Sequence, residues 1–359
     1  MYNTTMNEFP QKQRPPEALQ VTREPTNVCS SPVPCIHLVA TGGTIAMQLD
    51  PHHGGAVPAV SGAALVAALP DVSQIAQLSV EEFSNIPSEH MTSEIWLRLS
   101  ARVNQLVSSS NAAGIVITHG TDTMEETAFF LDLTVPGGLP ILLTGAQRPA
   151  SAPDADGPQN LCDAIRVAAL PESRGRGVMI VMNGEIHTAR EATKANTEDL
   201  DAFVSRSGTD LGYVQGDRVC FISEVSPRHH LPLPASLPRV DIIPMYAGAD
   251  DAALQAALAR GAAGLVIAAV GAGNVNHALF DGVIAALRRS VAVVIATRVP
   301  HGLVRPLYAY VGGGASLKKA GAILAGALTP QKARILLMLA LAAGERGEAL
   351  QERFEGSNL

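Results

Sequence analysis

The sequence predicts an α/β protein with two domains, and three observations support this. The chain has 359 residues, which is more than one ordinary hydrophobic core accommodates. From residue 36 onward, short apolar runs alternate with stretches of helical periodicity. A proline-rich segment at 227–238 interrupts the alternation, which then restarts. Such alternation favours a mostly parallel sheet with helices on both faces, once in each domain.

The predicted division of the chain follows the same features. Residues 1–35 are polar and proline-rich, and are expected to form a disordered or loosely docked tail. The first domain is predicted over residues 36–225 and the second over 240–359, with a linker at 226–239.

Strands of the first domain are predicted from short apolar runs that stop at glycines or turns. Ser61 and Thr92 are suited to cap two of its helices, and the helix after Thr92 has apolar residues at spacings of three and four. The predicted strands are 36–40, 114–118, 140–144 and 177–182, and the predicted helices are 61–69, 92–107, 124–133 and 156–169. Residues 185–220 are more polar and carry several turn glycines.

The second domain repeats the pattern in shorter form. Its last helix is predicted to begin with Pro330, because proline is tolerated in the first turn of a helix. The predicted strands are 240–243, 264–269 and 291–296, and the predicted helices are 250–260, 276–288 and 330–343.

Composition excludes several classes of partner. A net charge of −7 and an isoelectric point near 5.8 argue against nucleic acid or an anionic membrane surface as a partner. No run of apolar residues is long enough for a transmembrane helix, and residues 1–34 lack the apolar core of a secretory signal. The cysteines form neither a Cys-x-x-Cys pair nor a disulfide framework, and Cys162 and Cys220 are expected to be small buried hydrophobes. A reducing cytoplasm is therefore the expected location.

Two threonine motifs carry the chemical signal. Thr41-Gly42-Gly43-Thr44 and Gly120-Thr121-Asp122-Thr123 each follow a predicted buried strand, where loops of α/β sheets expose backbone N–H groups to ligands. Taken alone, the first motif is more typical of an ordinary strand-to-helix turn than of a ligand site. Because the Gly-x-Gly-x-x-Gly spacing is absent, a dinucleotide site is not indicated, and neither a cofactor nor a metal is predicted.

The second motif is more specific. Thr123 is expected to cap the following helix, with Glu126 as its capping-box partner. Helix capping does not explain the preceding Thr121 and Asp122, because a cap does not need a second hydroxyl and a carboxylate just before it.

These motifs resemble the signatures of bacterial L-asparaginases. The segment VATGGTIA at residues 39–46 is similar to one signature, and residues 117–133 are similar to the other. Further similar segments, in the same order along the chain, are GAQRP at 145–149, ADGP at 155–158, TKANT at 193–197, GAGN at 271–274 and PQKAR at 330–334. The resemblance covers roughly residues 36–345. It implies a larger N-terminal domain with a mixed, mostly parallel sheet and a smaller, flavodoxin-like C-terminal domain.

The resemblance also implies the site residues. Thr44 matches the nucleophile, and Thr121, Asp122 and Lys194 match a second catalytic set. The substrate-binding positions that it implies are Ser88 for the substrate carboxylate, Glu89 near its amine, the carbonyl of Ala146 facing the leaving nitrogen, and Asn274 reaching in from a neighbouring subunit. A homotetramer made of two dimers is implied as well. The lysine can act as a base only if its pKa falls toward neutrality, or else the proton leaves through hydroxyls and water.

The chain departs from the family pattern at two places. A tyrosine is usual on the loop after the first motif, whereas residues 47–58 contain none and Gly55 stands in its place. His52 or His53 could supply a proton acceptor there, or both could be solvated surface side chains. A glutamate is usual after residues 298–300, but 301–310 contain no acid. Arg305, Tyr308 or Tyr310 could replace it, or this loop could be an interface that touches no ligand.

Three functions remain open from the sequence. The leading one is hydrolysis of L-asparagine, or a close relative, to the carboxylate and ammonia. The altered loops favour as a rival an enzyme of the same fold that acts on another amide, an imide or a D-amino acid. The missing tyrosine leaves open a catalytically silent amino-acid-binding protein.

Overall fold

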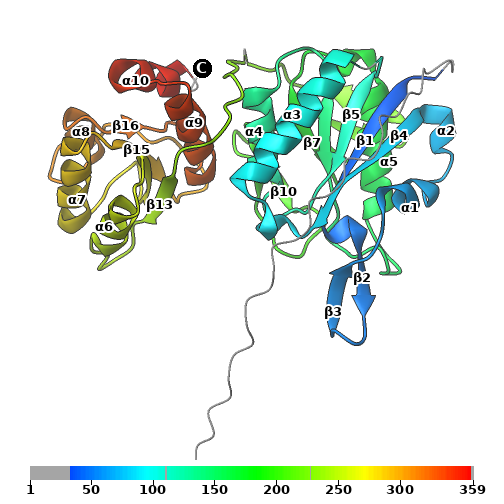
Figure 1. Ribbon diagram of the computed structural model, residues 1–359, viewed down its shortest axis with the longest axis horizontal. Helices are drawn as coiled ribbons and strands as arrows, with labels where there is room; N and C mark the ends of the chain where they lie inside the picture. The colour runs from blue at the N-terminus through cyan, green and yellow to red at the C-terminus, as the bar shows by residue number, and fades with distance from the viewer. Residues whose placement is uncertain (1–32, 110, 227, 357–359) are drawn as a thin grey trace, which may run out of the picture.

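The computed structural model describes residues 33–109, 111–226 and 228–356. The predictions for residues 1–32 therefore fall outside the described part of the chain. Two separate α/β bodies are visible, each with its own sheet (Figure 1). The predicted fold class is confirmed, whereas the exact boundaries given above for the domains and linker remain predictions.

The N-terminal domain is built on an eight-stranded sheet with the order β12-β11-β8-β7-β6-β5-β1-β4. These strands are β1 (Cys35–Gly42), β4 (Gln77–Ile86), β5 (Gly114–Thr118), β6 (Ile141–Thr144), β7 (Val178–Met182), β8 (Glu185–Thr188), β11 (Gly212–Gln215) and β12 (Arg218–Phe221). Five neighbouring strands pair in parallel, in the order β4, β1, β5, β6 and β7. Strands β8, β11 and β12 continue the sheet with antiparallel pairing. The sheet is therefore mixed and mostly parallel, as predicted.

Both faces of this sheet are covered by helices (Figure 1). The helices are α1 (Gly62–Ala67), α2 (Val72–Ile75), α3 (Ser93–Ser109), α4 (Met124–Thr134) and α5 (Gly157–Ala169). Alternate residues of β1 point to opposite faces: Ile36 and Leu38 pack with α1, α2 and α5, while Val39 packs with α3 and α4. Ser61 and Thr92 accept hydrogen bonds from the main chain of the helices that follow them, as predicted.

The C-terminal domain has a parallel four-stranded sheet with the order β13-β14-β15-β16. Its elements are β13 (Val240–Pro244), α6 (Ala252–Ala259), β14 (Gly264–Ala269), α7 (His277–Arg288), β15 (Ala292–Thr297), α8 (Gly314–Lys319), β16 (Ile323–Leu324), α9 (Pro330–Ala342) and α10 (Gly347–Gly356). Helices α6 and α7 pack on one face, and α9 and α10 pack on the other.

Helix α9 of the C-terminal domain packs against both domains. Its buried residues share one apolar cluster with strands of the C-terminal sheet and with Trp96, Phe129 and Phe130 of α3 and α4. Trp96 and Phe130 stack with their ring centroids 5.4 Å apart. Figure 1 shows α9 on the side of the C-terminal domain that faces α4. This continuous core fixes one domain against the other.

Several elements were not predicted. Strand β4 runs parallel to β1 at the sheet edge and has no clear period of apolar residues; its burial comes from neighbours distant in sequence. Residues 47–58 form a hairpin of β2 (Met47–Asp50) and β3 (Gly55–Pro58), which projects from the domain in Figure 1. Three further short elements lie within the second half of the first domain: the 3-10 helix η3 (Pro171–Ser173) and the strands β9 (Ala192–Lys194) and β10 (Phe203–Ser205).

Two local predictions were wrong in detail. Thr123 occupies the position before α4, but its side chain does not cap the helix. Its hydroxyl instead donates to the main-chain oxygen of Ser88, 2.8 Å away, and so ties two loops of the site together. Cys162 is buried as expected, whereas Cys220 is only half-buried. In the described part of the chain, no helix is both long and apolar enough to cross a membrane.

Candidate active site

The two threonine motifs meet because their strands are neighbours. β1 and β5 pair in parallel, so the loops that follow them lie at the same edge of the sheet. Gly43 has a φ of 87°, and a Cβ on it would lie 2.2 Å from the main-chain nitrogen of Gly120. Only a residue without a side chain allows this backbone-to-backbone approach. The glycines therefore bring Thr44 and Thr121 to one place.

A cavity of about 230 Å³ opens at this edge. Six of the eight predicted site residues line it: Thr44, Ser88, Glu89, Thr121, Asp122 and Lys194. Gly43, Met47, Pro87, Gly120, Gln147 and Thr197 complete the lining. Polar groups dominate the wall, which suits a small, charged ligand rather than an apolar one.

The other two predicted residues do not line this cavity. Ala146 is completely buried directly before Gln147 in the loop after β6. Asn274 lies in the C-terminal domain after β14, where its side-chain oxygen accepts from the main-chain nitrogen of Gly314 at 3.4 Å. Within a single chain, Asn274 is therefore not brought together with the threonines.

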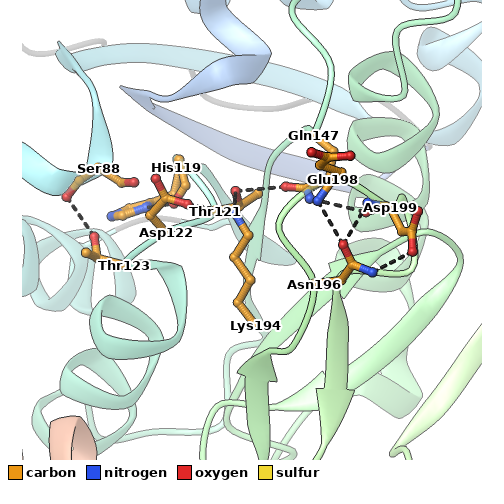
Figure 2. Close-up of polar contacts among 11 residues, drawn as sticks. Ser88, His119, Thr121, Asp122, Thr123, Gln147, Lys194, Asn196, Glu198 and Asp199 are labelled. Carbon is orange, nitrogen blue, oxygen red and sulfur yellow. Dashed lines mark hydrogen bonds and ion pairs between the residues drawn. The ribbon is translucent and has the colours of Figure 1, made fainter.

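Lys194 links the second threonine to the aspartate. It ends β9, and its Nζ atom donates to Thr121 Oγ1 at 2.7 Å and to Asp122 Oδ1 at 2.6 Å (Figure 2). Thr121 is buried, and the Lys194 side chain is only 16% exposed, whereas Asp122 is mostly exposed. The three side chains predicted to act together are thus in direct contact.

Gln147 is a site residue for which the sequence suggested no role. Its Nε2 atom donates to the main-chain oxygen of Asp199 at 3.2 Å, so its Oε1 atom faces Thr121. The Thr121 hydroxyl donates to that oxygen at 3.0 Å (Figure 2). Since Lys194 also donates to Thr121, the hydroxyl proton points toward Gln147 and the hydroxyl oxygen toward the lysine. The adjacent match of residues 145–149 to the family was the signal that could have identified this residue.

The Gln147 loop is held by a carboxylate. Asp156 precedes α5 and accepts hydrogen bonds from the main-chain nitrogens of Gln147 and Arg148 at 3.0 and 2.9 Å. Asn160, one turn further into the helix, also donates to Asp156 at 3.0 Å. The similar segment at residues 155–158 therefore supports the loop at 145–149 rather than the ligand.

A buried hydrogen-bonded chain fixes the Thr121 loop from behind. Trp96 Nε1 donates to Thr127 Oγ1 at 2.9 Å, and Thr127 is 2.9 Å from His119 Nε2. The other ring nitrogen of His119 lies 2.7 Å from the carbonyl oxygen of Gly120, which can only accept. His119 is therefore neutral with the proton on Nδ1, and complete burial lowers its pKa to about 4.

The alternatives suggested for the missing tyrosine lie outside the cavity. His52 and His53 are exposed in the turn between β2 and β3, and His53 Nδ1 lies 2.6 Å from Asp50 Oδ2. Gly55 begins β3 on the same hairpin. On the other side, Arg305, Tyr308 and Tyr310 are exposed in the C-terminal domain and do not line the cavity either.

Comparison with known proteins agrees with the geometry. Residues 35–226 match the family model of the asparaginase N-terminal domain, and residues 239–354 match that of the glutaminase/asparaginase C-terminal domain. The chain is 41% identical to a probable periplasmic L-asparaginase of Haemophilus influenzae, over 90% of this chain and 93% of the relative. It is 38% identical to L-asparaginase 2 of Escherichia coli, over 90% of this chain and 93% of the relative.

A solved structure shows the same fold. The crystal structure of a probable cytoplasmic L-asparaginase from Campylobacter jejuni superimposes with a TM-score of 0.82 at 37% identity, covering 90% of this chain and 99% of that one. The resemblance stated from the motifs is thereby confirmed over both domains. The chain belongs to the asparaginase family and is a hydrolase that acts on amides.

Proposed function

We propose that this protein hydrolyses L-asparagine to L-aspartate and ammonia, with Thr44 as the nucleophile. The observation that carries the proposal is the contact of Lys194 with both Thr121 and Asp122, inside a cavity that Thr44 also lines. Relatives that are named L-asparaginases, at 37–41% identity over nearly the whole chain, support the choice of substrate.

Substrate recognition follows from the charges around the cavity. The Asp122 carboxylate and the exposed Glu89 suit the α-ammonium group of an amino acid, and Ser88 offers a hydroxyl to its carboxylate. The carbonyl of Ala146, next to Gln147, is proposed to accept a hydrogen bond from the leaving amide nitrogen. Asn274 of a neighbouring subunit is proposed to complete the site.

The proposed reaction has two covalent steps. The Thr44 oxygen attacks the side-chain amide carbon, the C–N bond breaks and ammonia leaves after taking a proton, so that an ester with Thr44 remains. Water then attacks the ester, which releases aspartate and returns the proton to Thr44. In the described part of the chain, no hydrogen bond occupies the main-chain N–H groups of Thr44 and Thr121. We propose that they stabilise the oxyanion, which is worth roughly 3–4 kcal/mol per donor in other hydrolases.

The test measures ammonia release from L-asparagine by the wild type and by Thr44→Ala and Thr121→Ala. Each substitution is expected to lower kcat by more than about a thousandfold while the melting temperature stays near that of the wild type. Thr209→Ala serves as the control, because Thr209 is exposed and does not line the cavity. Full activity in either cavity variant would disprove the assigned roles.

A second candidate is hydrolysis of another amide, an imide or a D-amino acid. Among the described residues, no tyrosine lines the cavity, and residues 301–310 contain no acid. A panel of amides, scored by kcat/KM, separates the two candidates: a higher value for another substrate than for L-asparagine would favour the second. An amino acid that raises the melting temperature but releases no ammonia over hours would instead indicate a silent binding protein.

We also propose that the protein forms a homotetramer and that it is located in the cytoplasm. A linker at residues 226–239 is proposed to divide the chain into its two domains. Leu303, Leu307 and Tyr310 are exposed apolar side chains of the C-terminal domain, in keeping with a covered surface in an assembly. Light scattering that reports a monomer would contradict the role of Asn274. One similar protein is called cytoplasmic and another periplasmic, so cell fractionation is the test of location.

A further inference from the structure

A second group of polar side chains lies on strand β8, away from the cavity. Glu185 and His187 both belong to this strand, with the His187 ring completely buried. One ligand atom each from Glu185, His187 and Asp210 lies within 4.8 Å of the other two. None of the three lines the threonine cavity, and the proposed reaction uses none of them.

The partners of His187 Nδ1 determine where its proton lies. Asp210 Oδ1 is 3.0 Å from this nitrogen, and Ser205 Oγ is 2.9 Å from it. A carboxylate can only accept a hydrogen bond, so Nδ1 must carry the hydrogen. With its hydrogen on Nδ1, the ring has Nε2 as the nitrogen whose lone pair is available to a ligand.

That lone pair faces another acceptor. Nε2 of His187 is buried and has no hydrogen-bond partner among the described residues. The closest charged atom recorded for it is Glu185 Oε2, at 3.6 Å. Two acceptors that face each other, one of them fully buried, repel unless an electrophile lies between them. The separation is too long for a single shared proton, because N–H···O bonds span about 2.7–3.2 Å.

A metal ion fits the separation. Zinc lies about 2.0–2.1 Å from an imidazole nitrogen and about 2.0–2.2 Å from a carboxylate oxygen, which in a tetrahedron places the two ligands roughly 3.4 Å apart. The observed 3.6 Å is close to that value. We propose that His187 Nε2 and Glu185 bind a divalent transition-metal ion of the zinc class, with water completing the coordination.

Asp210 completes the arrangement as a supporting residue. A metal-binding histidine usually donates its other ring N–H to a carboxylate, which fixes the ring and makes the ligand nitrogen more basic. Asp210 occupies this place beside Nδ1. Asp201 adds negative charge near both Glu185 and His187, while the positive charge of the buried Lys332 opposes a cation there. Since β8 lies between β7 and β11, the ion would stabilise the antiparallel side of the large sheet.

Cobalt(II) is the probe for the test, because it occupies zinc sites and absorbs visible light when bound. Purified full-length protein, first stripped with a chelator, is titrated with Co²⁺ and then with Zn²⁺. We expect one Co²⁺ per chain, visible absorption bands that Zn²⁺ abolishes, and a higher melting temperature with the metal. Glu185→Gln should abolish the bands, and Asp210→Asn should weaken binding by about 10- to 100-fold.

Matched variants make the outcome decisive. The exposed pair of His53 and Asp50 is also a histidine beside a carboxylate, so His53→Asn controls for binding at any such surface pair. Unchanged Co²⁺ bands in His53→Asn and lost bands in Glu185→Gln support the site. Absence of Co²⁺ binding in the wild type, retained bands in Glu185→Gln, or loss only in His53→Asn would each overturn it. Because Glu185 is partly exposed, its glutamine variant should fold even if His187→Asn does not.

Discussion

Lys332 of α9 donates a hydrogen bond of 2.5 Å to the main-chain oxygen of Ala192 in β9. Ala192 lies two residues before Lys194 on the same strand. The same amine also donates to the main-chain oxygen of Arg190 at 2.8 Å. Lys332 is completely buried, and it belongs to the C-terminal domain, whereas β9 carries a predicted catalytic residue of the N-terminal domain. One domain thus holds the strand that positions Lys194 in the other.

Removing the Lys332 amine should reduce both stability and activity. Lys332→Met leaves one buried and one partly buried carbonyl group without their donor, which is expected to lower the free energy of unfolding by about 2–4 kcal/mol. A small shift of β9 should lower kcat by about ten- to a hundredfold. Urea unfolding and ammonia release measure the two effects. Lys318→Met is the control, since Lys318 makes an exposed ion pair with Glu355 and should change stability by less than about 1 kcal/mol.

The buried Lys332 also predicts that stability depends on pH in the alkaline range. Burial lowers the pKa of Lys332 from 10.5 to about 8. Between these values the unfolded chain binds a proton that the folded chain has lost, so stability rises with pH through this window. The contribution is about 3 kcal/mol. Unfolding measured from pH 7.5 to 10.5 should show the gap between wild type and Lys332→Met growing with pH. A constant gap would contradict the lowered pKa.

The lowered pKa of His119 predicts that stability falls at acidic pH. Its pKa is lowered to about 4 by burial, from the ordinary value of 6.5. As pH falls from 6.5 to 4, the unfolded chain takes up a proton that the folded chain does not, so stability is lost in that window. The loss from this group is about 3 kcal/mol. His119→Gln should therefore show a shallower decline of unfolding free energy over this window than the wild type. Equal slopes in the two proteins would rule out the assignment.

Gln147 is expected to orient the Thr121 hydroxyl by accepting its proton in a hydrogen bond. Gln147→Leu removes the oxygen that accepts the Thr121 proton, and should lower kcat/KM about tenfold, the equivalent of one hydrogen bond. Gln147→Glu retains an oxygen acceptor and should lose less. Gln255→Leu is the control, because Gln255 is exposed and contacts only Asp251 through its side chain in the described structure. Equal losses in the leucine and glutamate variants would show that the acceptor does not matter.

The hairpin histidines are expected to be dispensable. His52 and His53 are exposed at the turn between β2 and β3, outside the cavity that contains Thr44. The double substitution His52→Ala/His53→Ala should leave kcat within about twofold of the wild type. A tenfold or larger loss at unchanged melting temperature would show instead that the hairpin supplies a group to the reaction.

Much of the fold could be predicted because its most regular helices and strands have a clear pattern of apolar residues in their own sequences. Buried strands such as β5 and β14 are short, continuous apolar runs, and helix α3 has its apolar residues on one face. Strand β4 escaped prediction because it lies at the sheet edge and is buried only in part, so its sequence shows no strong pattern. The hairpin over residues 47–58 was missed because both its strands are exposed and contribute little to the core.

The sequence by itself determined the fold class, the family and the residue types of the site, because the glycine–threonine loops and Lys194 form short local motifs. Only the tertiary structure decided which groups touch them. Gln147 faces Thr121, Thr123 binds Ser88 rather than capping its helix, and Lys332 holds β9. Each of these contacts joins residues far apart in the chain, or depends on the direction in which a side chain points. Local pattern contains neither kind of information, since it records spacing along one element and not the packing between elements.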